Sequence, residues 1–291
     1  REYTRRVLPN VGEHVDIPAP DINTSDREMA WFADEAGRIL GRPVPGIVTG
    51  KPVESGGNPG RKEATGRGLA TIVVELLRRL GKDPFTANIA IQGYGNVGRQ
   101  TTLCLAEQNC RIVALSDISG GIYHADGIDI DDVEAHLREN PGSLLDTYDA
   151  PGLERIDNAT LLRLPVDILI PAALENQITL EVAQSMKATA IVEGANGPTT
   201  LDAQDTLVSR QIVVVPDILA NAGGVYGSYI EWVSNTTGAE WNLERTRAAI
   251  QKAMLDAFDT VWKRSRQNGG DLRAAAYEIA LERVASAMQE A

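Results

Sequence analysis

The sequence predicts an α/β fold, namely a Rossmann-like doubly wound sheet preceded by the remnant of another domain and followed by a helical carboxy-terminal tail. Three observations favour this fold class. Short apolar segments alternate with amphipathic segments between residues 86 and 215, and a glycine-rich turn follows the first apolar segment. Residues 221–291 carry mainly helical patterns. A sequence in which predicted strands and helices alternate is typical of a parallel sheet that is covered by helices.

The first 45 residues do not follow this alternation. Four prolines between residues 18 and 45 bracket one predicted helix at residues 25–40. Ser25 and Glu28 stand three positions apart and form a capping box at the start of this helix. We therefore interpret this region as what remains of a separate domain.

The rest of the chain predicts the wound sheet and then the tail. A long amphipathic helix is expected at residues 63–80, after a glycine-rich loop at residues 55–61. Predicted strands lie at residues 88–92, 111–116, 166–170, 190–193 and 212–215. Predicted helices lie between these strands at residues 96–108, 130–139, 179–187 and 201–209. The tail is expected to be helical at residues 221–234 and 246–289, with breaks near Gly238 and at residues 268–270.

The turn after the first strand carries the pattern G-x-G-x-x-G at the entry of a helix. Gly93 allows a tight turn, Gly95 lets backbone N–H groups approach a pyrophosphate, and Gly98 lets the helix pack closely on the strand. Asp117 lies 19 residues after Gly98, where a carboxylate can accept both hydroxyls of an adenosine ribose. This combination predicts a dinucleotide-binding site for NAD or NADP.

The residues that follow Asp117 bear on the choice between these two cofactors. A 2′-phosphate needs an Arg or Lys nearby and is repelled by an unpaired carboxylate. Residues 117–121 read Asp-Ile-Ser-Gly-Gly and offer no basic group, so we expect NAD. NADP stays open, because a neighbouring loop can supply an arginine.

Composition excludes several classes of function. The chain has 291 residues, 43% of them hydrophobic, and a formal net charge of −12, which argues against nucleic-acid partners and anionic membranes. No apolar run is long enough to span a bilayer. Cys104 and Cys110 lack metal-ligand spacing and fit a reduced, cytoplasmic protein. The three histidines form no cluster, so we expect no metal site.

Two carboxylates lie on either side of a stretch that is stiffened by Pro18 and Pro20. Asp21 follows this stretch and would be held in one place, as an acid/base group requires. Its alternative role as a helix cap is already filled by Ser25. Asp16 competes with Asp21 for the acid/base role.

Three further positions are candidates with weaker signals. Small residues at 221–225 open a helix after the last strand, so a ligand can approach its amino-terminal amides. Ser228 lies one helical turn after Gly224, but a lone serine on a helix usually faces solvent. Lys51 lies in a loop, where a lysine is by default a solvated charge.

Seven motifs, taken in order along the chain, resemble the family of glutamate, leucine, phenylalanine and valine dehydrogenases. They are residues 16–21, 49–52, 61–68, 93–98, 171–174, 193–196 and 221–225. The match covers nearly the whole chain and is far more specific than any single motif. Residues 229–232 and 274–277 resemble the glutamate enzymes more than the other branches.

The resemblance implies reversible NAD(P)-dependent oxidative deamination of L-glutamate to 2-oxoglutarate and ammonia. Asp21 matches the aspartate that shuttles protons, Ser228 the serine that holds the side-chain carboxylate, and Val225 lines the same pocket. The resemblance, together with the glycine turn, gives a larger set of cofactor-binding residues. They are Arg61, Thr65, Gly93, Tyr94, Gly95, Asn96, Val97, Gly98, Asp117, Ile118, Ala172, Ala173, Asn196 and Asn221.

The resemblance also implies a domain organisation. Residues 1–48 would be the remnant of the substrate and oligomerisation domain, and residues 49–220 the dinucleotide-binding domain. Residues 221–291 would be a hinge helix and carboxy-terminal helices that pack back on the first domain. The full-length protein is expected to form a homo-hexamer.

One departure from the family is large. The family's catalytic lysine, in a Lys-Gly-Gly context, belongs to a segment upstream of Arg1, and the chain does not begin with Met. That lysine lowers the pKa of the aspartate and polarises the carbonyl oxygen. We therefore expect an amino-terminally truncated chain that is close to inactive as given. A non-catalytic dinucleotide-binding module and a dehydrogenase of leucine, valine or phenylalanine remain as alternatives.

Overall fold

The computed structural model describes residues 1–21, 23–267 and 269–290. The chain forms two compact units. Unit 1 consists of Arg1–Thr65 and Gly223–Ala253, and unit 2 consists of Gly66–Ala222 and Met254–Ala291.

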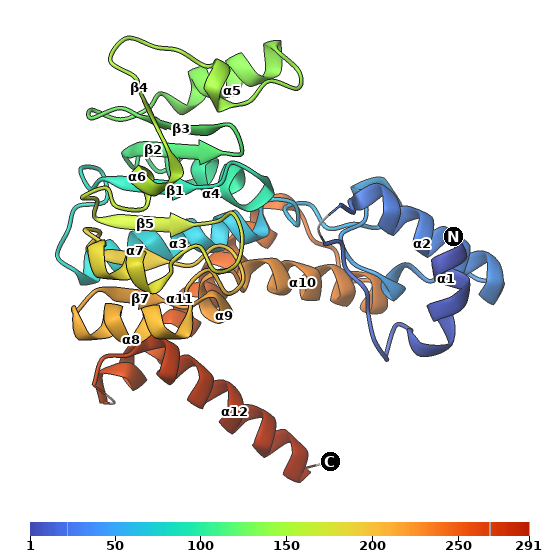
Figure 1. Ribbon diagram of the computed structural model, residues 1–291. Helices are drawn as coiled ribbons and strands as arrows, with labels where there is room; N and C mark the ends of the chain where they lie inside the picture. Colours follow the sequence, from blue (N-terminus) through green and yellow to red (C-terminus); the bar gives the residue numbers. More distant parts are fainter. Residues whose placement is uncertain (22, 268, 291) are drawn as a thin grey trace. The chain divides into compact units, whose positions relative to one another are not determined.

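Unit 2 is built on a seven-stranded sheet with the strand order β4-β3-β2-β1-β5-β6-β7 (Figure 1). The strands are β1 (Ile89–Gln92), β2 (Ile112–Asp117), β3 (Gly120–Tyr123), β4 (Glu154–Ile156), β5 (Ile168–Pro171), β6 (Ala190–Val192) and β7 (Val213–Val215). β1 pairs in parallel with both β2 and β5, and the parallel order continues through β6 to β7. The chain thus leaves β1 for one side of the sheet and returns on the other, which makes the β1–β5 boundary the topological switch point.

Helices connect and cover these strands. They are α4 (Asn96–Ala106), α5 (Ile130–Glu139), the 3₁₀ turn η4 (Leu145–Thr147), α6 (Asn158–Leu161), α7 (Leu180–Ser185), α8 (Leu201–Ser209) and α9 (Asp217–Ala220). α12 (Leu272–Glu290) lies against β7. Two long helices, α3 (Ala64–Arg79) and α11 (Leu243–Gln267), begin in unit 1 and continue into unit 2.

The central strands of unit 2 are buried on both faces. Every residue of β1 and β5 is buried, and so are the first five residues of β2. Ile89, Leu115 and Ile170 are fully buried. Strands covered by helices on both sides read as continuous apolar runs, which is why these three segments are visible in the sequence.

Unit 1 is mainly helical. Its elements are α1 (Glu2–Val7), η1 (Leu8–Asn10), α2 (Asp26–Leu40), η2 (Pro45–Ile47), η3 (Val53–Ser55), α10 (Gly223–Thr237) and the first part of α11. The predicted capping box of Ser25 and Glu28 is confirmed at the start of α2. Phe32 of α2 packs on Ile47 and Val48 in an apolar core.

The predicted elements agree with the structure except where segments are very short. All five predicted strands exist with ends shifted by at most two residues, and α3, α5 and α8 lie where they were expected. β3 and β4, which were not among the predicted strands, pair antiparallel at one edge of the sheet. These strands hold four and three residues, too few for an apolar period to be visible.

Glycines end the helices of the tail as predicted. Gly238 has a φ of +74° directly after α10, a backbone conformation that glycine adopts without strain. The predicted break at residues 268–270 includes Asn268, which lies outside the described residues. Gly269 and Gly270, with φ of +80° and +95°, separate α11 from α12.

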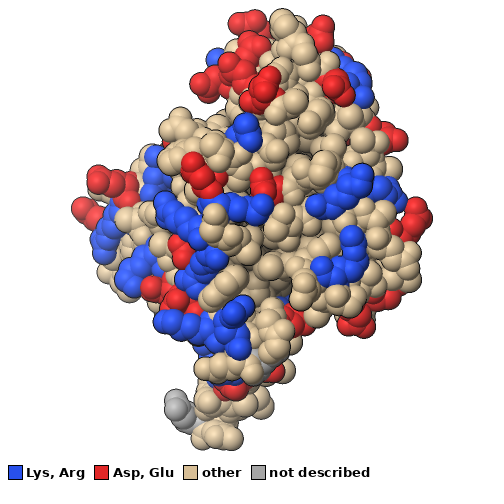
Figure 2. Space-filling model, turned by 90° about the vertical axis from the view of Figure 1, so that its left-hand side faces the viewer, with Lys and Arg blue, Asp and Glu red and all other residues tan. Residues whose placement is uncertain are grey.

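Two properties of the helices and of the surface bear on possible partners. Among the helices that the structure describes, none is both long and apolar enough to cross a bilayer. On the face shown in Figure 2, Lys and Arg side chains are interspersed with Asp and Glu side chains. On this face, an anionic ligand would therefore meet both signs of charge.

Candidate functional site

The glycine turn after β1 has the geometry that its sequence predicts. Gly93 has a φ of +93°, and a Cβ atom there would lie 2.9 Å from the carbonyl oxygen of Ala172. A Cβ atom on Gly98 would lie 1.8 Å from the carbonyl oxygen of Gly93. Only glycine fits these two positions, since real Cβ atoms do not approach so closely.

Gly95 differs from its two neighbours in the motif. No heavy atom lies within 4 Å of the position that its Cβ would occupy. Gly95 is also the N-cap of α4, and no side chain caps this helix end. The first-turn N–H groups of α4 thus face open space at the positive end of the helix, where an anion binds favourably.

This turn lies at the switch point of the sheet. Gly93 follows β1, and Ala172 and Ala173 follow the neighbouring strand β5. A Cβ on Gly93 would also lie 2.9 Å from Cα of Ala173, so the two loops touch. The structure therefore brings these predicted cofactor residues together in the crevice where such folds bind ligands.

Tyr94, inside the glycine motif, is held by a charged pair. Its hydroxyl donates to Glu134 of α5 at 2.9 Å, and Arg99 Nε donates to the same carboxylate oxygen at 2.8 Å. Burial and the Glu134 charge raise the pKa of Tyr94 far above its usual range. These bonds fix the glycine turn to α5, a support that the sequence pattern did not predict.

Asp117 lies at the end of β2 with both carboxylate oxygens engaged. Oδ1 accepts from the Ser119 backbone N–H at 2.8 Å and from its hydroxyl at 2.5 Å, and Oδ2 accepts from Leu145 N–H at 2.8 Å. These bonds hold the carboxylate in one orientation. The neighbouring Ile118 side chain is 94% exposed and presents an apolar surface beside it.

Two predicted asparagines also meet in unit 2. Asn221 Nδ2 donates to Asn196 Oδ1 at 2.8 Å and approaches the carbonyl oxygen of Gly194 at 3.4 Å. The buried Glu193 accepts from Arg273 and from the Asp217 N–H, which holds the start of this loop. The loops after β6 and β7 are thus joined through side-chain amides.

Unit 1 contains the other group of predicted residues. Arg61 Nε donates to Ser228 Oγ at 2.8 Å, which joins the loop before α3 to α10. Burial lowers the pKa of the Arg61 guanidinium, although a guanidinium stays charged in proteins, and Glu231 acts in the opposite direction. Among the described residues, no carboxylate forms an ion pair with Arg61. Its positive charge therefore lacks a close counter-ion and is suited to an anionic ligand.

Small residues let α10 approach this loop closely. A Cβ on Gly224 would lie 2.4 Å from Thr65 Oγ1, and a Cβ on Gly227 would lie 2.8 Å from the Cβ of Ala64. Val225, between these glycines, has a side chain that is 72% exposed. Thr65, Val225 and Ser228 are thus presented by the same short region of unit 1.

The expectation that Lys51 is a solvated charge is wrong. Lys51 is only 4% exposed, and its Nζ donates to Glu231 at 2.5 Å and to the carbonyl oxygen of Val48 at 2.6 Å. Glu231 also accepts from the N–H of Gly50 at 3.0 Å. Glu231 lies 180 residues away in the sequence, so no local pattern could indicate the pair.

Asp21 lies on the exposed surface of unit 1. Its backbone N–H donates to Thr24 Oγ1 at 2.7 Å, and its carbonyl oxygen accepts from the Thr24 hydroxyl at 2.8 Å. These bonds form a compact turn before α2. The preceding segment is fixed as well, because Thr49 N–H donates to the carbonyl oxygen of Pro18 at 3.0 Å.

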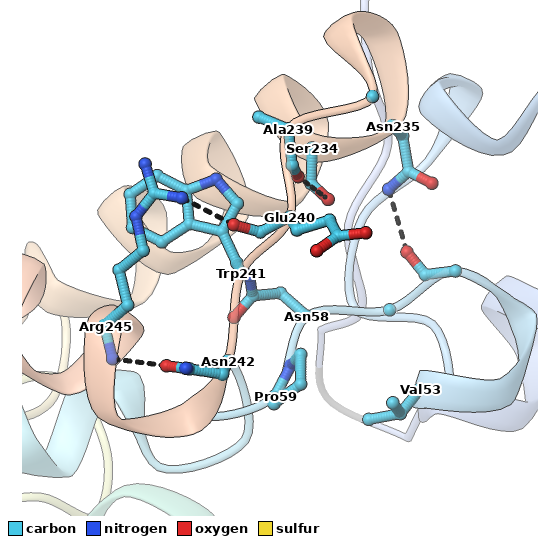
Figure 3. A pocket seen from close by; sticks show the side chains of 13 residues that line it. Val53, Asn58, Pro59, Ser234, Asn235, Ala239, Glu240, Trp241, Asn242 and Arg245 are labelled. Carbon is cyan, nitrogen blue, oxygen red and sulfur yellow. Dashed lines mark hydrogen bonds between the residues drawn. The ribbon is translucent and has the colours of Figure 1, made fainter.

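A hollow of ≈ 680 Å³ lies elsewhere in unit 1, between the loop that starts at η3 and the segment that joins α10 to α11 (Figure 3). Asn58 is 5% exposed, and its Nδ2 has no partner among the described residues. The Arg245 guanidinium lies 4.1 Å from the centre of the Trp241 ring, and Glu240 adds a carboxylate to the same lining. Both signs of charge line this hollow, and it shares no residue with the Arg61–Ser228 pair.

The described residues contain no group of three or more His, Cys, Asp or Glu side chains that could hold a metal ion. Cys104 and Cys110 are both buried, and neither forms a disulfide bond within the described residues. The groups that the predicted site residues present are backbone amides at a helix end, side-chain amides, the Ser228 hydroxyl, the Arg61 guanidinium and carboxylates.

Two family models match the chain. The model described as Glutamate/Leucine/Phenylalanine/Valine dehydrogenase matches residues 56–291. The model described as Glu/Leu/Phe/Val dehydrogenase, dimerisation domain, matches residues 1–38.

Similar proteins are glutamate dehydrogenases. The chain is 46% identical to glutamate dehydrogenase of Thermotoga maritima, over 100% of this chain and 69% of that protein. It is 48% identical to glutamate dehydrogenase A2 of Halobacterium salinarum, over 99% of this chain and 68% of that protein. It resembles the hetero-hexameric glutamate dehydrogenase of Thermus thermophilus in its leucine-bound form, with a TM-score of 0.88 and 33% identity, over 97% of this chain and 66% of that chain.

These matches do not decide between NAD and NADP, and they cover only part of the length of the related proteins. Related proteins include an NAD-specific enzyme of Clostridioides difficile and an NADP-specific enzyme of a Synechocystis strain. The chain spans about two thirds of the length of the relatives that it matches.

Proposed function

The chain belongs to the glutamate, leucine, phenylalanine and valine dehydrogenase family, and from this premise we propose that its function is the reversible oxidative deamination of L-glutamate to 2-oxoglutarate and ammonia. The observation that carries the choice of glutamate is the contact between Arg61 and Ser228. A hydroxyl and a charged guanidinium without a close counter-ion favour a substrate whose side chain ends in a carboxylate.

Arg61 therefore receives a different role from the one expected at the sequence level. Arg61, expected at the cofactor, donates to the serine expected at the substrate. We assign both residues to the distal carboxylate of glutamate, with Val225 lining the same pocket. Removal of a hydrogen bond to a charged group costs about 1.5–3 kcal/mol, which gives each of these residues weight in substrate selection.

Asp21 is proposed to move the proton at the reacting centre. An exposed carboxylate on a segment fixed by two prolines can accept a proton from the substrate ammonium group and return it to water. The bonds between Asp21 and Thr24 keep this turn compact while leaving the position open to solvent.

The residues of unit 2 fit a dinucleotide. The uncapped first turn of α4, at Gly95, Asn96 and Val97, supplies amides for the pyrophosphate. We assign Asp117 and Ile118 to the adenosine ribose and base. When bound, the cofactor supplies the acceptor for the hydride that leaves Cα of glutamate. Asn196 and Asn221, joined by a hydrogen bond, are assigned to the nicotinamide half, together with Ala172 and Ala173.

NAD is the proposed cofactor. Among the described residues, no Lys or Arg forms an ion pair with Asp117, and the carboxylate is held in place by Ser119 and Leu145. A fixed carboxylate without a basic neighbour favours a ribose 2′-hydroxyl over a 2′-phosphate. Two buried cysteines that form no disulfide bond further support a reducing compartment, so we propose that the reaction takes place in the cytoplasm. By analogy with the hexameric relative, we propose a homo-hexamer as the working assembly.

The proposal is tested with the complete product of the gene that encodes this chain. NADH formation is measured by absorbance from NAD and L-glutamate, and in parallel from L-leucine, L-valine and L-phenylalanine. Glutamate is expected to give the highest kcat/KM. In the Ser228→Ala variant, kcat/KM for glutamate is expected to fall about 10- to 100-fold, because a hydrogen bond to the substrate carboxylate is lost.

Two results would contradict the proposal. Preferred turnover of an apolar amino acid would move the chain to another branch of the family. NADH binding without turnover of any of the four amino acids would favour a non-catalytic dinucleotide-binding module.

A further inference from the structure

A buried ion pair in unit 1 joins two segments that the proposed function needs. The Lys51 and Glu231 side chains are both 0% exposed, and their charged atoms lie 2.5 Å apart. Glu231 Oε2 accepts from the N–H of Gly50 at 3.0 Å, and Oε1 accepts from the N–H of Lys51 at 3.3 Å. One carboxylate thus binds a side chain and two backbone groups of the same loop.

Glu231 connects this pair to Ser228, because both residues belong to α10. Glu231 follows Ser228 by three positions on α10, so the two side chains lie on the same face of the helix. Ser228 also accepts from Arg61, whose charge Glu231 stabilises. Any movement of α10 against the loop that contains Lys51 therefore moves the proposed carboxylate site as well.

The loop that contains Lys51 also contacts the segment that precedes Asp21. Gly50 has a φ of +81°, and a Cβ there would lie 2.6 Å from Cδ of Pro20. Thr49 N–H donates to the carbonyl oxygen of Pro18 at 3.0 Å. The loop that Glu231 holds is thus packed directly on the residues that carry Asp21.

We propose that Lys51 and Glu231 act as a positioning pair, which fixes the separation between Asp21 and the Arg61–Ser228 site. This inference rests on the proposed function, because the distal carboxylate and the reacting amino group of one glutamate must reach both places together. The pair touches no substrate in this scheme. Its effect is to keep Asp21 at a fixed distance from the place where Arg61 and Ser228 bind the substrate.

The bonds of Glu231 explain why an ion pair suits this role. Directional hydrogen bonds to Gly50 and Lys51 define one position of the loop, whereas apolar contacts tolerate sliding. Removal of one partner alone would leave the other charge buried without a counter-ion, so a test has to remove both charges together. A misplacement of about 1 Å at a reacting centre can lower a rate on the order of 100-fold.

The experiment compares two double variants of the complete gene product. In Lys51→Met with Glu231→Gln, the charges are removed, but the Gln carbonyl oxygen can still accept from the N–H of Gly50. In Lys51→Met with Glu231→Leu, the N–H groups of Gly50 and Lys51 lose their acceptor on α10. For both, the kcat and KM for glutamate, the melting temperature and the affinity for NADH are measured.

The expected result separates positioning from stability. The Gln double variant should keep kcat within about threefold of the wild type, whereas the Leu double variant should lose about 10- to 100-fold in kcat. Affinity for NADH should be unchanged in both, because the cofactor residues lie in unit 2. As a control, Glu35→Gln removes another buried carboxylate of unit 1 and should lower the melting temperature without lowering kcat.

Other results overturn the inference. Equal kcat values in the two double variants would show that the hydrogen bonds of Glu231 do not position the site. A loss of kcat that follows the melting temperature through all variants, Glu35→Gln included, would show a purely structural role. Absence of glutamate turnover in the wild-type protein would overturn the proposed function as well, so the two failures are distinguishable.

Discussion

At the scale of single residues, Glu28 shows how local bonds set the acidity of a side chain. The Ser25 hydroxyl and N–H both donate to Glu28 Oε2, at 2.7 and 2.8 Å, and Arg27 donates to Oε1. The hydrogen bonds from Ser25 and Arg27 lower the pKa of Glu28 from 4.5 to about 2. The charged form of Glu28 is thus favoured when α2 is folded.

This shift makes the stability of α2 depend on pH. Because the folded pKa lies below the ordinary value, the contribution of Glu28 is complete above about pH 4.5 and is lost as pH falls toward 2. We expect the Glu28→Gln variant to melt at a lower temperature than the wild type at pH 6. The difference should disappear near pH 2, and melting curves between these values check it. A difference that does not change with pH would contradict the prediction.

The environments of some other residues could not be predicted from the sequence. Ser25 and Glu28 are visible because their bonds join positions three apart. The environments of Lys51 and Arg61 depend on Glu231 and Ser228, which are far away along the chain. Burial and pairing of a loop lysine arise only when distant segments pack together, so its default reading as a solvated charge is wrong.

At the scale of elements, the turn between β1 and α4 contains two glycines whose roles, one in stability and one in cofactor binding, can be separated by experiment. Gly98 serves the fold, because a Cβ there would lie 1.8 Å from the carbonyl oxygen of Gly93. Gly95 faces open space in the structure. The two positions belong to one motif but have different surroundings.

We expect Gly98→Ala to lower the melting temperature of the protein by several degrees, because the backbone of the turn must shift. Gly95→Ala should leave the melting temperature within about 2 °C and weaken NADH binding about tenfold or more, since its methyl group would occupy the approach of the pyrophosphate. Thermal melting and NADH fluorescence measure the two effects. Unchanged NADH binding in Gly95→Ala would show that the pyrophosphate does not lie at this helix end.

The same contrast explains which elements could be predicted. β1, β2 and β5 are buried on both faces and appear as apolar runs, while α2 and α3 are long and amphipathic. β3 and β4 are too short and too rich in glycine or charge to show a period. Their pairing is set by the edge that β2 offers, which is a tertiary property.

At the scale of the whole molecule, the chain contains six lysines, at positions 51, 62, 82, 187, 252 and 263. None of these lysines lies in a Lys-Gly-Gly segment, and Lys51 is committed to Glu231. The proposed chemistry gains from a lysine that polarises the carbonyl oxygen of the substrate. We therefore propose that these 291 residues bind the cofactor but do not complete the reaction alone.

This proposal predicts a separation of binding from turnover. The 291-residue chain should bind NADH with an affinity within about threefold of the complete gene product, because unit 2 carries the proposed cofactor residues. Its rate of NADH formation from glutamate should be lower by about 100-fold or more. Fluorescence and absorbance assays on the two proteins check this. Turnover by the 291-residue chain at a normal rate would contradict it.

The ends of the sheet in unit 2 have a consequence for how copies of the protein behave at high concentration. Both edge strands, β4 and β7, hold only three residues, and β4 presents the charged Glu154 and Arg155. An edge this short offers few unpaired backbone groups to a strand from another molecule. Growth of the sheet from one chain into the next, the first step of fibril formation, is therefore disfavoured at both edges.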